Sequence, residues 1–252
     1  MNALETVQIG NATLYCGDCR DLLPSLVIVA KHVVTDPPFD AEAHTAQRRV
    51  LGKGISKCRD LENQPLSFAP LDANTRAAVL AWSAYRCSGW FIAFCQTEAV
   101  GTWRASLEAV GIKWRRAGVW VKPDGSPQLS GDRPAQGHEA IAMAWCGKGR
   151  SRWNGGGSSG VFIHCKHDRG TGHGGASKEH PTQKPRRLMN ELIHLFTEPG
   201  DLVIYPFMGS GSTGVACLEL GRRFIGIEKD RAFFKVACSR LDAAYAQHRL
   251  FA

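Results

Sequence analysis

Apolar runs of strand length alternate with amphipathic segments along most of this 252-residue chain. One run, residues 33–35, must stop at Asp36, because Pro37 and Pro38 lack a backbone N–H and cannot continue a ladder. Such a strand presents a carboxylate and two rigid prolines at the edge where open α/β sheets bind ligands. Further strands are expected at residues 89–95, 117–122, 138–146, 201–207 and 223–228.

Amphipathic spacing predicts helices between these runs. The expected helices cover residues 72–86, 186–196, 212–221 and 231–250. Because strands and helices alternate, the sequence indicates an α/β fold with a doubly wound, mostly parallel sheet.

Two polar stretches interrupt the alternation. Residues of about 41–60 are basic and polar, which predicts a long, mobile surface loop. Residues 123–179 are rich in Gly, Ser, His and basic side chains, which predicts either a linker or a small inserted lobe. We expect residues 1–122 and 180–252 to form two halves of one sheet, with the lobe inserted between them.

A glycine-rich turn follows the strand expected at residues 201–207. Residues 209–214 read GSGSTG, and an acid, Glu228, ends the next expected strand. Glycines allow a tight turn and a close backbone approach to a ligand, and an acid at this position can bind a ribose diol. The alternative is an ordinary glycine-rich turn between a strand and a helix.

The late position of this turn constrains the sheet. Only residues 215–252 follow it, enough for a helix, a strand and a last helix, so the other strands must come from the N-terminal half. Asp36 should then lie beside the glycine turn. A dehydrogenase usually carries its glycine turn early, and a phosphate-loop nucleotidase needs Gly-Lys-Ser or Gly-Lys-Thr, so both classes are disfavoured.

Composition indicates which partners and metals the protein can be expected to bind. Lys and Arg number 31 against 23 Asp and Glu, which gives a net charge of +8 and suits a polyanionic partner. We see neither a signal peptide nor an apolar span of membrane length, so we expect a cytoplasmic protein without a membrane partner. The segments HCKH and CGDC each lack a second Cys/His pair at zinc spacing, so no metal is expected.

Five segments, in this order, resemble motifs of the DNA amino-methyltransferases of the permuted β class, which use S-adenosylmethionine. They are YCGDCRDLLPSL, TDPPF, HPTQKP, PFMGSGSTG and FIGIE, and they lie between residues 15 and 230. The resemblance implies a permuted, Rossmann-like methyltransferase fold in which residues 123–179 form a target-recognition lobe. The chain departs from the family at Tyr205, where the family usually has Asp.

The resemblance also implies an activity: sequence-specific transfer of a methyl group from S-adenosylmethionine to adenine N6 in double-stranded DNA, after base flipping. It assigns catalysis to Asp36, Pro37, Pro38 and Phe39, with Asp36 and the Pro37 carbonyl accepting the amine hydrogens and Phe39 stacking on the base. It assigns cofactor binding to Asp18, Cys19, Asp36, Thr182, Lys184, Phe207, Gly209, Ser210, Gly211, Thr213 and Glu228.

Basic residues in the two polar stretches are candidates for DNA contacts. We expect the loop after Phe39 to reach phosphates and the Gly-rich segment to read bases, because phosphate contacts position and base contacts specify. The candidates are Arg48, Arg49, Lys53, Lys57, Arg150, Arg152, His167 and Arg169.

Three alternatives stay open at this point. Cytosine N4 is also an exocyclic amine, although Asp at the head of the motif favours adenine. Tyr205 and the positive charge would also suit a DNA-binding protein with a degenerate cofactor site. The third alternative is a methyltransferase that acts on RNA or protein amines. A homodimer is also possible from the sequence.

Overall fold

The protein is described by a computed structural model at residues 5–38, 71–128, 131–166 and 183–251. The strands are β1 (Glu5–Ile9), β2 (Ala12–Cys16), β3 (His32–Thr35), β4 (Trp90–Cys95), β5 (Lys113–Val121), β6 (His138–Trp145), β7 (Val161–Ile163), β8 (Leu202–Tyr205) and β9 (Arg223–Glu228). The helices are α1 (Cys19–Ser25), α3 (Ala73–Arg86), η1 (Thr97–Ala99), α4 (Val100–Ala109), α5 (Arg186–Phe196), α6 (Ser212–Glu219) and α7 (Arg231–Phe251).

These strands form one sheet in the order β1-β2-β9-β8-β3-β4-β6-β5-β7. The strands from β2 to β4 in this order are parallel, and β1 and β6 run antiparallel to their neighbours. Strand β3 pairs with β8, where His32 lies opposite Val203 and Val33 opposite Ile204. The expected doubly wound, mostly parallel sheet is therefore confirmed, with the glycine-turn strand beside the strand that ends before Asp36.

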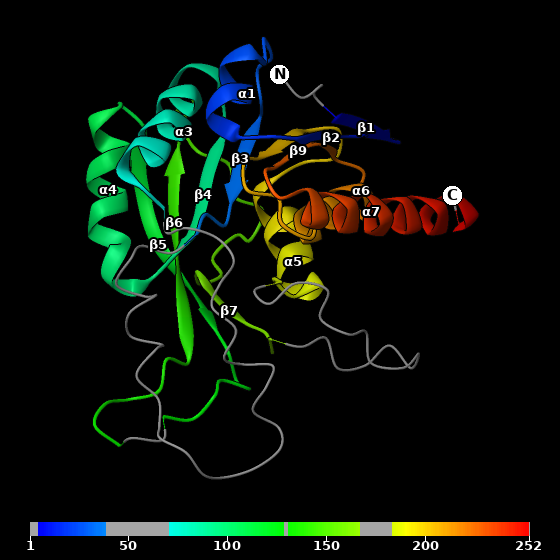
Figure 1. Cartoon of the computed structure of the whole chain (residues 1–252). Coiled ribbons are helices and arrows are strands. Elements are labelled where there is room, and N and C mark those ends of the chain that lie inside the picture. Colours follow the sequence, from blue (N-terminus) through cyan, green and yellow to red (C-terminus); the bar gives the residue numbers. More distant parts are fainter. Residues whose placement is uncertain (1–4, 39–70, 129–130, 167–182, 252) are drawn as a thin grey trace.

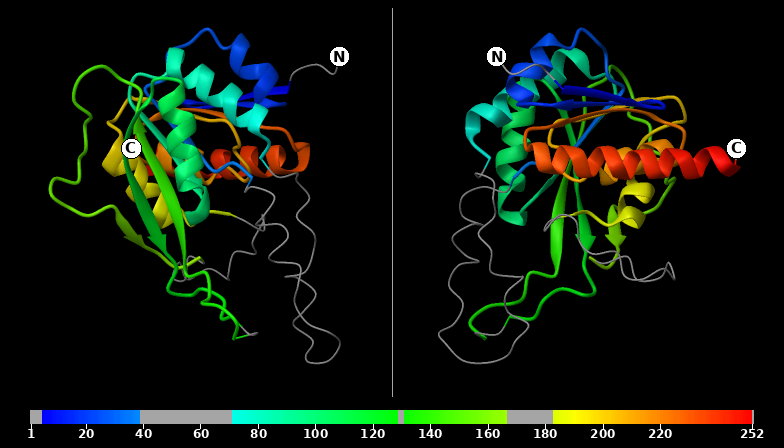
Figure 2. Two further views of the ribbon diagram at one scale, coloured as in Figure 1. Left: turned by 90° about the vertical axis from the view of Figure 1, so that its left-hand side faces the viewer. Right: turned by 45° about the vertical axis from the view of Figure 1, so that its right-hand side comes forward.

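Helices cover both faces of this sheet (Figure 1). Helices α1, α3 and α4 pack on one face around buried residues such as Phe91, Trp103 and Leu107. Helices α5, α6 and α7 pack on the other around Leu192, Phe224 and related side chains, and the views in Figure 2 show the same layers. In the described part of the chain, no helix combines the length and apolar character that a membrane span requires.

The expected strands and helices correspond to observed ones, with ends that differ by a few residues. The sequence reading assigned no secondary structure to β1, β2, α1, α4 or β7. Within the expected inserted lobe, residues 123–179, the described strands β6 and β7 belong to the main sheet, because β6 lies between β4 and β5 and β7 pairs with β5. The sequence predicted the strand at 138–146, which is β6, but its Gly-rich surroundings gave no indication that this strand and β7 join the main sheet. The role of residues 123–179 in target recognition stays a prediction, and the loop at 41–60 lies outside the described residues.

His32 joins three neighbouring strands at the edge of the sheet far from Asp36. The backbone N–H of Trp90 donates to Nδ1 over 3.0 Å, so Nε2 carries the proton and donates to Asp201 over 3.0 Å. Burial holds the pKa of His32 below its ordinary value, because a charged ring would be desolvated.

This histidine should make stability depend on pH. In the unfolded chain, His32 binds a proton near pH 6.5, but in the folded chain it binds one only at lower pH. The free energy of unfolding is therefore higher above pH 6.5 and decreases as the pH falls below it. His32→Gln can keep both hydrogen bonds without titrating. We expect it to flatten the loss of unfolding free energy between pH 7 and 5, by up to about 1.4 kcal/mol per pH unit.

Urea unfolding at several pH values measures this effect. The matched control is His194→Gln on the exposed side of α5. Equal slopes for wild type and His32→Gln would contradict the interpretation.

Candidate active site

The carboxyl ends of the parallel strands gather polar residues at one edge of the sheet. Asp36 follows β3, Tyr205 ends β8 and Glu228 ends β9. From β8 the chain continues to β9 on one side of the pair, and from β3 it continues to β4 on the other side. The order of connections therefore reverses between β3 and β8. Such a switch point is where doubly wound sheets bind ligands.

Asp36 and its two prolines lie at this switch point. The side chain of Asp36 is only 16% exposed, and its Oδ2 accepts a hydrogen bond from the ammonium of Lys184 over 2.5 Å. Pro37 is buried and Pro38 is partly buried. Because each proline fixes φ, the carboxylate and the Pro37 carbonyl are held on a stiff segment.

Lys184 belongs to a buried cluster of two cations and two anions. Its ammonium lies 3.3 Å from Oε2 of Glu139, at the start of β6. The other oxygen of Glu139, Oε1, accepts from Lys122, which follows β5, over 2.5 Å. The sequence reading included Lys184 but missed Glu139 and Lys122. The sequence feature that could have indicated Glu139 and Lys122 is that each charge lies at the end of an apolar strand, and these two strand ends meet at the same edge of the sheet.

Aromatic rings line this cluster. The ammonium of Lys184 lies 4.8 Å from the centre of the Phe94 ring, and that of Lys122 lies 4.6 Å from the Trp120 ring. Ring faces attract cations and exclude water, so both ammonium groups are held in defined places.

The two carboxylates of the cluster differ in basicity. Burial raises the pKa of Asp36 above its ordinary value, and the charge of Glu139 adds to this effect. Burial alone would also raise the pKa of Glu139, but Lys184 and Lys122 outweigh it and hold that pKa below its ordinary value. Burial alone would lower the pKa of Lys184, yet Asp36 and Glu139 keep it raised. The cluster therefore holds a charged lysine and an unusually basic aspartate.

Tyr205 is buried next to this cluster. Burial and the charge of Asp36 raise the pKa of its phenol well above the ordinary value, so the group stays neutral. The phenol shares a hydrogen bond with the side chain of Thr213, at the start of α6. The position usually held by a carboxylate in the resembling family is here a neutral, satisfied hydroxyl.

The glycine turn contacts Glu228 directly. The N–H of Gly209 donates to Oε2 of Glu228 over 2.7 Å, and the N–H of Asp230 donates to Oε1 over 2.7 Å. Gly211 has φ +79°, and a Cβ there would lie 2.7 Å from Leu241 on α7. A side chain at this position would therefore be strained in φ and would clash with α7. Each oxygen of Glu228 keeps accepting capacity for hydroxyl donors of a ligand.

Asp18 lies beside Glu228, because Gly17 donates its N–H to the Glu228 carbonyl over 2.8 Å. Hydrogen bonds from Arg20 hold the pKa of Asp18 far below its ordinary value, and Lys229 lies 3.0 Å away. Asp18 also caps α1. Cys19 is buried in the core.

Arg240 on α7 braces the glycine turn and was missed by the sequence reading. Its guanidinium donates to the carbonyl of Ser210 over 2.6 Å and to the Ser210 hydroxyl over 2.9 Å. A longer contact of 3.4 Å reaches the hydroxyl of Ser212. In the sequence, this contact could be suspected only from the two serines of the turn and the arginine on the terminal helix.

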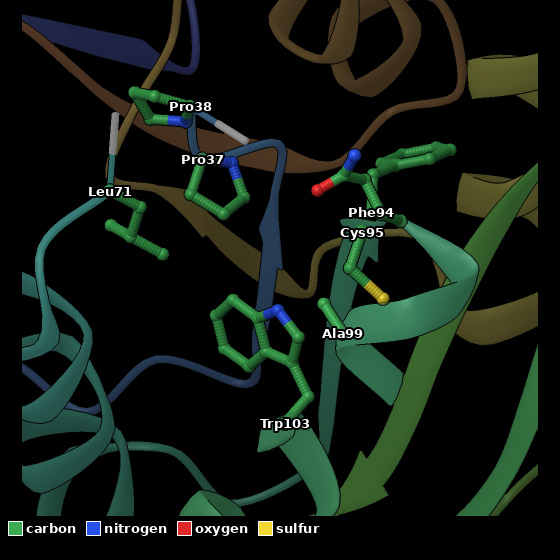
Figure 3. A pocket seen from close by; sticks show the side chains of 8 residues that line it. Pro37, Pro38, Leu71, Phe94, Cys95, Ala99 and Trp103 are labelled. Carbon is green, nitrogen blue, oxygen red and sulfur yellow. The ribbon is translucent and has the colours of Figure 1, made fainter. Parts of the chain in front are cut away.

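A small apolar pocket opens beside the prolines (Figure 3). It is lined by Pro37, Pro38, Leu71, Phe94, Cys95, Gln96, Ala99 and Trp103. Its walls come from the ends of β3 and β4 and from the start of the η1–α4 segment. A flat, largely apolar group is the kind of ligand that such walls suit.

The structure brings together Asp36, Pro37, Lys184 and the glycine turn with Thr213 and Glu228, and Phe207 lies partly buried at the same edge. It does not bring Arg150 and Arg152 to them. Trp90, at the start of β4, donates to the carbonyl of Arg152 over 2.5 Å, which places that segment at the opposite edge of the sheet. The other predicted residues lie outside the described part of the chain: Phe39, Arg48, Arg49, Lys53, Lys57, His167, Arg169 and Thr182.

Comparison with known proteins identifies the family. A family model described as DNA methylase matches residues 30–239, most of the chain. The chain belongs to the DNA methylase family. Among relatives of this family member, the type II methyltransferase M2.DpnII of Streptococcus pneumoniae is 49% identical over 65 residues. M2.LlaDCHI of Lactococcus lactis subsp. cremoris is 44% identical over 64 residues. Each match covers about a quarter of this chain and 24% of the relative's own length.

Solved structures share the fold across nearly the whole DNA methylase chain. The M1.HpyAVI–SAM complex superposes with a TM-score of 0.69 at 24% identity, covering 92% of this chain and 99% of the other. The cytosine-N4-specific PvuII DNA methyltransferase also gives a TM-score of 0.69, at 15% identity, covering 96% of this chain and 93% of the other. The Rossmann-like methyltransferase fold is thus confirmed.

The brace on the glycine turn of this family member can be tested without a ligand. Arg240→Met removes hydrogen bonds to the turn, so local opening should become easier by about 1 kcal/mol. We expect amides of residues 209–214 to exchange hydrogen roughly fivefold to tenfold faster, as measured by mass spectrometry.

The matched control is Arg231→Met at the other end of α7, whose side chain pairs with Glu5 at the surface. It should leave this exchange unchanged. Equal protection of the turn in Arg240→Met and wild type would argue against the brace.

Proposed function

We propose that this chain is a site-specific DNA methyltransferase that transfers a methyl group from S-adenosylmethionine to adenine N6 in double-stranded DNA. One observation carries the proposal: the basic, buried Asp36 lies on a proline-stiffened strand end at the switch point beside the glycine turn. Membership of the DNA methylase family supports the same reading.

The residues at the sheet edge fit the proposed cofactor. Glu228 would accept from ribose hydroxyls, and the turn at Gly209–Gly211 would let the backbone approach the ligand. Asp18 lies at the same end of the site as Glu228, and Lys184 lies beside Asp36. Thr182, Phe207 and Cys19 stay predictions as cofactor contacts. S-adenosylmethionine, when bound, would supply a methyl group attached to a sulfonium. The methyl group would pass to the amine nitrogen, and the sulfur would keep the electron pair of the broken carbon–sulfur bond.

Asp36 and the Pro37 carbonyl would act on the accepting amine. The lone pair of an exocyclic amine is delocalised into the base ring, so the amine is a weak nucleophile. Two fixed acceptors that draw on its hydrogens localise the lone pair on nitrogen, and the proton released after transfer can pass to Asp36. The target base would have to be flipped out of the duplex to reach Asp36, because the amine cannot reach a methyl donor while stacked, and the apolar pocket beside Pro38 lies next to that position.

The proposed DNA contacts involve basic residues in two segments. The basic residues at 48–57 and at 167–169 lie outside the described residues. Arg150 and Arg152 lie at the edge opposite Asp36, so their location gives no support to base reading at the same site. The net charge of +8 agrees with a polyanionic partner.

Cytosine N4 is the second candidate target, because the neighbouring PvuII enzyme is cytosine-N4-specific. The head residue Asp36 favours adenine in our interpretation. Methylating plasmid DNA with the purified chain and mapping modified bases by sequencing decides between them. N4-methylcytosine without N6-methyladenine would overturn the adenine assignment, and no DNA modification at all would overturn the enzyme proposal.

Asp36→Asn tests the catalytic assignment. The amide keeps the shape of the carboxylate but loses its charge and one accepting oxygen. We expect kcat to fall at least about a hundredfold, the scale of removing one preorganised polar group. Tritium transfer from S-adenosylmethionine to duplex DNA measures kcat, and calorimetry with the cofactor checks that the site is intact. Activity within tenfold of wild type would reject Asp36 as the acceptor.

Tyr205→Asp tests the departure from the family. A carboxylate here would be buried beside Asp36, which should lower the Tm of the free protein. The cofactor carries ammonium and sulfonium charges, so its affinity should rise, by roughly tenfold, and the Tm gain on binding should exceed that of wild type.

Calorimetry and thermal melts with and without S-adenosylmethionine measure both effects, and Tyr205→Phe is the control that keeps the ring. Unchanged or weaker affinity would mean that another acid already serves the cofactor's cations.

A further inference from the structure

Glu139 is a buried carboxylate that touches neither the pocket nor the glycine turn. Glu139 is 7% exposed and is the second residue of β6, whose following residues are all apolar. A carboxylate in such a place is costly unless it is paired. Glu139 is paired twice, with Lys122 through Oε1 and with Lys184 through Oε2.

These two contacts affect how Lys184 meets Asp36. The ammonium of Lys184 lies 2.5 Å from Asp36 and 3.3 Å from Glu139, so one cation is shared between two anions. A lysine held by Asp36 alone would neutralise that carboxylate more fully. Sharing leaves Asp36 more of its negative charge, and Lys122 fixes Glu139 where sharing can occur.

The negative charge of Glu139 also acts on Asp36 directly, and it too makes Asp36 more basic. Among the described residues, the charged and titratable groups facing Asp36 are Lys184 before α5, Glu139 on β6, Lys122 after β5 and Tyr205 on β8. Glu139 raises the pKa of Asp36, whereas Lys184 and Lys122 lower it. A more basic carboxylate accepts the hydrogens of an amine more strongly.

We propose that Glu139 is a positioning residue for methyl transfer, which acts on Asp36 through Lys184 and keeps that carboxylate free to accept the hydrogens of the target amine. Glu139 does this from behind Lys184, together with Lys122. The inference rests on the proposed function, because it takes Asp36 as the acceptor.

Glu139→Gln tests the proposal, since it keeps the shape of the side chain and removes its charge. Lys184 then pairs with Asp36 alone, and the pKa of Asp36 falls for two reasons: lost repulsion from Glu139 and closer neutralisation by Lys184. The acid limb of the kcat profile should therefore move to lower pH. The plateau of kcat should fall about tenfold to a hundredfold, while the dissociation constant of S-adenosylmethionine stays within about threefold.

A merely structural role makes a different prediction. In that case Glu139→Gln would lower Tm and reduce kcat in proportion to the folded fraction, with the acid limb where it is in wild type. The control is Glu191→Gln on α5, whose side chain is 41% exposed and contacts Nε2 of His164 over 2.5 Å, outside the cluster. It should change neither kcat nor the acid limb.

A double variant keeps the test decisive if Glu139→Gln folds poorly. Glu139→Gln with Lys122→Met removes one anion and one cation together, so no buried charge is left unpaired by the change. Because Lys184 then pairs with Asp36 alone, as in the single variant, the acid limb should still move to lower pH. An acid limb at the wild-type position in the folded single or double variant overturns the inference.

Asp36→Asn separates this inference from the proposed function. If Asp36→Asn keeps its activity, the proposed acceptor is wrong. If Asp36→Asn is inactive and Glu139→Gln has a wild-type profile, only the role of Glu139 is wrong.

Discussion

The parallel pairing of β3 with β8 is the constraint on which the rest of the site depends. It joins a strand from the first forty residues to one that begins at Leu202, and so brings the two ends of the chain into one sheet. The adjacent strand ends then supply Asp36 from one half and the glycine turn from the other. Without this pairing, neither half would carry a complete switch point, because β9 and β8 are inserted between β2 and β3.

Buried charge gives the site its second constraint. Four ionic groups lie at the same edge, and each would be expensive to bury alone. As two cations and two anions they balance, and the aromatic rings of Phe94 and Trp120 restrict where the lysines can lie. The arrangement is neutral as a whole but uneven in detail: Glu139 meets two lysines and Asp36 shares one. The unevenness leaves Asp36 the more basic carboxylate, which is the property that the proposed function requires of it.

The side of the site that carries the glycine turn is organised by hydrogen bonds to the backbone. Glu228 is held by the amides of Gly209 and Asp230, and Arg240 fixes the turn from the far side. A turn that is braced from both sides can present its amides without rearranging when a ligand arrives, which reduces the entropy lost on binding. Tyr205, neutral and satisfied by Thr213, shows that the usual carboxylate of the family is not needed to complete the packing here.

Local pattern was sufficient for much of this protein. The prolines after Asp36, the glycines before α6 and the acid at the end of β9 are short-range signals, and they predicted where these strands end and which residues follow them. The order of the segments also predicted that β3 and β8 would be neighbours, because too few residues follow the glycine turn to complete a sheet. What only the tertiary structure decided were contacts between segments far apart in sequence. The pairing of Glu139 with Lys184 and Lys122, the brace of Arg240 and the location of Arg152 at the opposite edge arise from how β6 and α7 lie against their neighbours. A charge at the end of one apolar strand carries no information about which charge will face it, since that depends on the strand order of the folded sheet.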